Sequence, residues 1–121
     1  MNLEQYLLNK LAEECSEVTK EALKASYYGL GSDYQGTNNR ERLQRELDDV
    51  ALMQSLLRYY DLWTRLSHHP DVSQFSTNTE RLAKFAHYLW MSHHLGNLQL
   101  QQTDYEFLSR MGLPKGAMFL E

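Results

Sequence analysis

Acidic residues recur at helical spacing in two places along this sequence. Glu14 and Glu17 are three residues apart, and Glu46 and Asp49 repeat the spacing, with 28 residues between Glu17 and Glu46. Residues three apart lie on one face of an α-helix, about one turn from each other. If the apolar stripes of the two helices pack together, we expect these four carboxylates to converge near the seam between the helices.

Such a gathering of like charges would raise the pKa of its members, so something must neutralise it. Sites made only of carboxylate oxygens suit Mg²⁺ or Mn²⁺, which keep positions for water and substrate phosphates. The pattern therefore favours metal-assisted hydrolysis of a phosphoric anhydride. The alternative is a solvated helix face, on which Glu17 would pair with Lys20 or Lys24.

Two long helices are expected to position these acids. The first runs from about Leu3 to Ser26 and ends at Gly29, which can supply a left-handed cap. Its apolar stripe, at steps of three and four, is Leu3, Leu7, Leu11, Cys15, Val18, Ala22 and Ala25. The second runs from about Asn39 to Leu66, with Asn38 as a candidate N-cap and Glu41 three residues later. We expect its buried side to be Leu43, Leu47, Val50, Gln54, Leu57 and Tyr60.

The remainder of the chain is expected to add a third helix and a tail. Residues from about Asn78 to Leu100 carry apolar groups on two sides, which indicates two packing partners, one of them a second subunit. Residues 101–121 form the tail. Because the 121 residues include 21 Leu, three Val and no Ile, we expect one all-α domain over residues 1–121, a helical bundle.

Composition excludes several classes of function. The net charge of −4 and the sequence pI of about 5.7 give no basic surface for a nucleic acid or an anionic membrane. The single cysteine, Cys15, excludes an internal disulfide and fits a reducing compartment. With neither a signal peptide nor an apolar run of membrane-spanning length in the sequence, we expect a cytoplasmic protein.

The acidic pattern also resembles the signature of a known superfamily. Glu13-Glu14-x-x-Glu17 followed by Glu46-x-x-Asp49 is similar to the motif of the MazG-like, all-α nucleoside triphosphate pyrophosphohydrolases. Lys10-Leu11-Ala12 and Glu46-Leu47-Asp48-Asp49-Val50 extend the likeness, which covers roughly residues 3–66. The superfamily includes dimeric dUTPases, dCTP pyrophosphatases and phosphoribosyl-ATP pyrophosphatase. Short members are common in phages and bacteria, so the cytoplasm would be the host's if the chain is phage-encoded.

The resemblance implies a reaction and a role for each acid. Glu14, Glu17, Glu46 and Asp49 would hold Mg²⁺ or Mn²⁺, and Glu13 would orient a ligand or help to activate water. The reaction would be (d)NTP + H₂O → (d)NMP + PPi, with water attacking the α-phosphorus. By the resemblance alone, a purine deoxynucleotide such as dGTP is favoured. Members of the family share their cores across subunits, which implies a homodimer or homotetramer.

Three further residues are candidates for substrate binding. Lys24 lies two turns beyond Glu17 and could reach a phosphate, Tyr27 could stack on a base, and Asn38 could bind a base edge. A surface lysine and ordinary turn chemistry explain the same residues. Three other functions also fit the sequence: a helical interaction protein, a nucleotide-binding sensor without turnover, and a pyrimidine diphosphatase related to dUTPases and dCTPases.

Overall fold

The computed structural model describes residues 1–34, 36–65 and 79–113. In chain order these form α1 (Leu3–Tyr28), β1 (Asp33–Tyr34), β2 (Thr37–Asn38), α2 (Asn39–Arg65), α3 (Thr79–His94) and α4 (Gln102–Arg110). The described chain is thus mostly helical, as predicted. No helix in this part of the chain is long and apolar enough to cross a membrane.

Local capping explains both ends of α1 and the start of α2. The Asn2 side chain accepts from the Gln5 backbone N–H at 2.9 Å, and the Gln5 side chain accepts from the Asn2 N–H at 3.0 Å. α1 ends at Gly29, whose φ of +92° favours glycine. Asn38 accepts from the Glu41 backbone N–H at 2.9 Å and so caps the first turn of α2. The predicted cap at Asn38 is confirmed, and Gly29 ends α1 as predicted, although its ψ of 147° differs from that of the expected left-handed helical cap.

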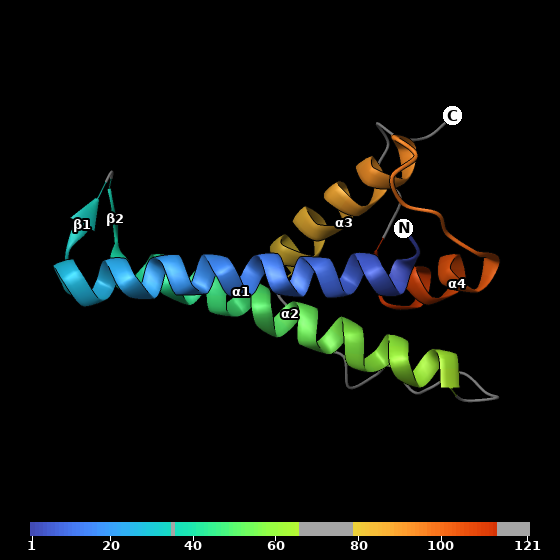
Figure 1. Ribbon diagram of the computed structural model, residues 1–121, viewed down its shortest axis with the longest axis horizontal. Coiled ribbons are helices and arrows are strands. Elements are labelled where there is room, and N and C mark those ends of the chain that lie inside the picture. The colour runs from blue at the N-terminus through green and yellow to red at the C-terminus, as the bar shows by residue number, and fades with distance from the viewer. Residues whose placement is uncertain (35, 66–78, 114–121) are drawn as a thin grey trace.

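α1 and α2 lie side by side and run in opposite directions, because the short hairpin of β1 and β2 turns the chain back at one end (Figure 1). Asp33 pairs with Asn38 and Tyr34 with Thr37 in this hairpin. α3 and α4 lie towards the other end of the helix pair. The antiparallel arrangement brings the middle of α1 next to the first half of α2, where both acidic pairs lie.

The hydrophobic core fills only the end of the molecule at which α3 and α4 pack. Its fully buried side chains come from every helix and from the segments around α4: Leu3, Leu7, Met53, Leu56, Leu89, Leu98, Phe107, Leu108 and Leu113. Beyond Leu7, Glu21 is the one residue of α1 that is buried. The expected stripe along α1 is therefore wrong in its second half, where Cys15 and Ala22 are exposed.

The buried face of α2 also differs from the prediction. Leu47 is 43% exposed and Gln54 is exposed, whereas Leu56 is fully buried. The buried residues of this helix are Asn39, Asp49, Leu52, Met53, Leu56 and Trp63. The helix carries two candidate stripes, and the one that is buried against the other helices includes Asp49.

The C-terminal part of the described chain is not a simple tail. α3 ends at His94 rather than near Leu100, and α4 follows within residues 102–110. Phe107 and Leu108 of α4 are fully buried, and Tyr60 of α2 donates to the buried Asp104 carboxylate at 3.0 Å. His93 joins α3 to α4, because its Nε2 lies 2.8 Å from the Tyr105 hydroxyl. Residues 101–113 thus complete the core, and residues 114–121 of the expected tail lie outside the described residues.

Candidate metal centre

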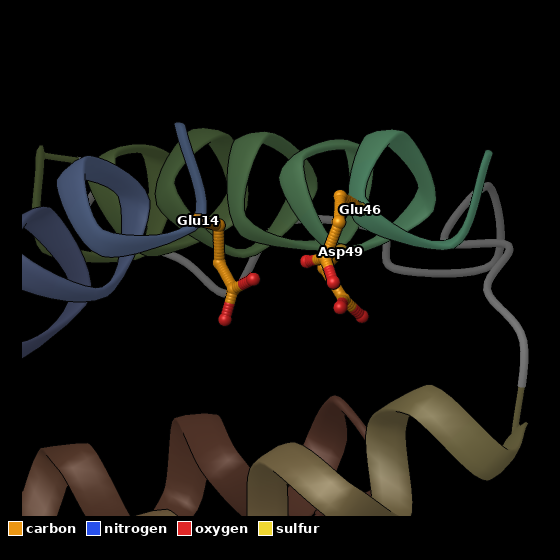
Figure 2. Close-up of side chains that lie close together, drawn as sticks. All are labelled: Glu14, Glu46 and Asp49. Carbon is orange, nitrogen blue, oxygen red and sulfur yellow. The ribbon is translucent and has the colours of Figure 1, made fainter. Parts of the chain in front are cut away.

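Three of the predicted carboxylates meet between α1 and α2. One oxygen from each of Glu14, Glu46 and Asp49 lies within 4.8 Å of the others. Figure 2 shows Glu14 extending from α1 and the other two from α2, all towards the side on which α3 lies. The cluster lies at the edge of the core, because Asp49 is about one helical turn before the buried Leu52 and Met53.

Burial and like charge make this cluster electrostatically unfavourable. The pKa of Glu14 is raised above its ordinary 4.5, first by burial and then by the charges of Asp49 and Glu46. Burial also raises the pKa of Glu46, with further contributions from Asp49 and Glu17. The Lys84 ammonium opposes both shifts. The three carboxylates are thus placed to gain from a bound cation.

The donor set fits the divalent cations that the sequence predicts. All three side chains offer oxygen atoms, from two helices, with spacing that allows one ion to contact each of them. Three protein oxygens leave positions for water and phosphate oxygens around Mg²⁺ or Mn²⁺. Clusters of acidic groups also occur without metals, so the fit supports a metal centre as a proposal.

Cations from α3 face the carboxylates. Arg81 Nη1 donates to Asp49 Oδ1 at 2.9 Å, and the two side chains are only 16% and 11% exposed. Lys84, three residues later and therefore on the same face of α3, acts on Glu14 and Glu46 through its charge. A cavity of about 310 Å³ contains both signs of charge, with Lys10, Glu13, Glu14, Asp49, Arg81 and Lys84 in its lining. We call this the first cavity.

The other two predicted acids lie beside the cluster rather than in it. Glu13 lines the first cavity, but its side chain is exposed and pairs with Lys10 at 3.2 Å. Glu17 is half-buried and its oxygens are outside the 4.8 Å group, although its charge raises the pKa of Glu46. The structure therefore brings together three of the four expected ligands.

A second cavity of about 460 Å³ lies farther along the helix pair, at the hairpin end. Its lining residues are Lys24, Tyr28, Ser32, Asp33, Asn39 and Arg42. Lys24 and Tyr28 continue the face of α1 that bears Glu14 and Glu17, at helical steps of three and four. Asn39 and Arg42 similarly precede Glu46 and Asp49 on α2. One polar face of each helix thus connects the second cavity with the carboxylates.

Of the predicted substrate-binding residues, only Lys24 lines this second cavity. Tyr27 is 81% exposed and outside the lining, and Asn38 caps α2. Their neighbours Tyr28 and Asn39 line the cavity, and the Asn39 side-chain amide donates to the Gly29 carbonyl oxygen at 2.9 Å.

Other residues near the carboxylates were not predicted from the sequence. Glu21 is 7% exposed, and its Oε2 has no hydrogen-bond partner within the described part of the chain, while Oε1 lies 3.4 Å from Lys24. Glu21 lies four residues after Glu17, and this helical spacing could have indicated that it shares the face of the predicted carboxylates. Arg81 and Lys84 had no such signal, since α3 carries no motif and its position depends on long-range packing.

Comparisons of the chain with protein-family models, with curated proteins and with solved structures found no match.

Proposed function

We propose that the chain is a metal-dependent nucleoside triphosphate pyrophosphohydrolase of the MazG-like type. Its reaction would be (d)NTP + H₂O → (d)NMP + PPi, with dGTP or another purine deoxynucleotide as the favoured substrate. The observation that carries this proposal is the convergence of Glu14, Glu46 and Asp49 within 4.8 Å. The base preference still rests on the resemblance of the sequence motif.

Each part of the site has a role in this proposal. Glu14, Glu46 and Asp49 would hold Mg²⁺ or Mn²⁺, and Glu17 would join them by a change of rotamer. When bound, the ion would lower the pKa of water and offset charge on the phosphate oxygens. Glu13, which lines the first cavity, would accept a proton or orient water.

The two cavities suit the two ends of a nucleotide. Lys10 and Lys84 in the first cavity offer cationic donors to phosphate oxygens. The second cavity offers an aromatic ring on Tyr28, an amide on Asn39 and the Lys24 ammonium, which suit a nucleoside. Seven residues of helix separate Glu17 from Lys24, roughly 11 Å along the axis and comparable to the length of a nucleotide.

The proposal includes self-association and a cytoplasmic location. Large apolar side chains are exposed on both long helices, including Leu8, Leu23 and Leu47. Burial of such side chains is the usual driving force for subunit association. A homodimer or homotetramer that covers them would complete the core, as the resemblance implies.

The decisive experiment separates products by anion exchange after incubation with each common NTP and dNTP plus Mg²⁺ or Mn²⁺. We expect the wild type to yield NMP and PPi, and Glu46→Gln to lose the reaction. Asp48→Asn is the matched control, because Asp48 is exposed, lies outside the cluster and is adjacent to Asp49. It should retain wild-type activity.

Other products would identify another function. NDP and inorganic phosphate would place the attack at a different phosphorus and contradict the proposal. Preference for dUTP or dCTP, with acceptance of the diphosphates, would indicate a pyrimidine diphosphatase. Nucleotide binding without turnover would indicate a sensor, and neither binding nor turnover would indicate a helical interaction protein.

A further inference from the structure

We propose that Arg81 is an exchangeable counter-ion of the metal centre: it neutralises Asp49 until a divalent cation binds, and then leaves Asp49 for a phosphate group of the substrate. The inference rests on the proposed function, because it needs Asp49 to be a metal ligand. It adds a role for α3, the helix that the sequence motif does not include.

The contact itself supports such an exchange. Arg81 Nη1 donates a hydrogen bond to Asp49 Oδ1 at 2.9 Å, and both side chains are largely shielded from water. Shielding strengthens the interaction between charges, so the guanidinium both neutralises the carboxylate and repels an approaching dication. A divalent cation that uses Asp49 fully must therefore compete with Arg81.

The surroundings provide the guanidinium with a second partner. Arg81 lines the first cavity together with Lys10 and Lys84. Phosphate oxygens of a nucleotide in that cavity would be acceptors that arginine binds well, often with two parallel hydrogen bonds. The helical spacing of Arg81 and Lys84 lets both cations meet the same phosphate group without rearrangement of α3.

Exchange predicts opposite effects of one substitution on two ligands. In Arg81→Met, Asp49 loses its counter-ion, so free Mn²⁺ should bind more tightly, on the order of tenfold, within the usual range of coupling between sites. At saturating Mn²⁺, the same variant should bind a non-hydrolysable nucleoside triphosphate more weakly by a similar factor. A residue that only supports the fold would weaken both.

The experiment measures free Mn²⁺ by electron paramagnetic resonance, without nucleotide, for the wild type and variants. Arg65→Met is the matched control, since Arg65 forms a 2.8 Å pair with Asp61 on the exposed surface, and it should bind Mn²⁺ as the wild type does. Arg81→Lys retains the charge and should remain closer to the wild type than Arg81→Met. Circular dichroism establishes that each variant is folded, and Arg81→Gln replaces Arg81→Met if the latter is not.

The outcomes separate this inference from the proposed function. Equal or weaker Mn²⁺ binding by Arg81→Met, with binding by the wild type that Glu46→Gln abolishes, would overturn the exchange and leave the metal centre intact. No specific Mn²⁺ binding by the wild type or by Arg81→Met would overturn the metal centre, and the exchange with it. Tighter Mn²⁺ binding together with weaker nucleotide binding supports the exchange.

Discussion

Substitution of Glu46 should have opposite effects on the rate of the proposed reaction and on the stability of the metal-free protein. Its charge is held near those of Asp49 and Glu17 at a partly buried position. We expect Glu46→Gln to lower the rate of pyrophosphohydrolysis by on the order of 10²-fold or more, as for loss of a group that stabilises charge in the transition state. In EDTA, the same variant should melt a few degrees above the wild type. A lower melting temperature would show that Glu46 stabilises the fold without a metal.

The raised pKa values of Glu14 and Glu46 also predict the direction of a pH effect on stability. In the metal-free protein, the folded state holds protons on these groups more tightly than the unfolded state, whose pKa is near 4.5. Folding is therefore less favourable as pH rises from about 4.5 through the raised values. Urea unfolding in EDTA should show the stability advantage of Glu46→Gln over the wild type growing as the pH rises above about 4.5. An advantage that shrinks over this range would contradict the assignment.

At the scale of helices, the short-range features could be predicted and the long-range ones could not. Gly29 and Asn38 act within a few residues of themselves, so the end of α1 and the start of α2 follow from local sequence. The acidic pairs likewise follow from helical spacing. The buried face of α2 depends on α3 and α4, which are distant in sequence. For the same reason Arg81, which completes the surroundings of Asp49, has no local signal.

Two substitutions in α2 test which of its two apolar stripes is buried. Leu56 is fully buried, so Leu56→Ala should lower the free energy of unfolding by about 2–5 kcal/mol. Leu47 is 43% exposed and on the other stripe, so Leu47→Ala should change it by less than about 1 kcal/mol in the isolated subunit. Urea denaturation of both variants at low protein concentration is the measurement. Equal losses would contradict the orientation of the helix.

For the molecule as a whole, the exposed apolar side chains predict self-association. Leu23 and Leu47 are large and exposed in the single subunit. Multi-angle light scattering should find a dimer or tetramer for the wild type and a monomer for Leu23→Glu or Leu47→Glu, because a buried unpaired charge opposes association. Arg58→Glu changes an exposed residue that is already charged, and it serves as a control for added negative charge. A monomeric wild type would contradict this prediction.

The confinement of the core to one end of the helix pair has a consequence for local unfolding. Apart from Glu21 and Asn39, no residue of α1 after Leu7 or of α2 before Asp49 is buried. Local openings cost the least free energy where few apolar side chains are buried. In the isolated subunit, amide hydrogens near the hairpin should therefore exchange with deuterium sooner than those of α1 near Leu7 or α2 near Leu56. A nucleotide in the second cavity would contact both helices near the hairpin. Its binding should therefore slow the deuterium exchange of amide hydrogens at this end of the molecule, which the core does not reach.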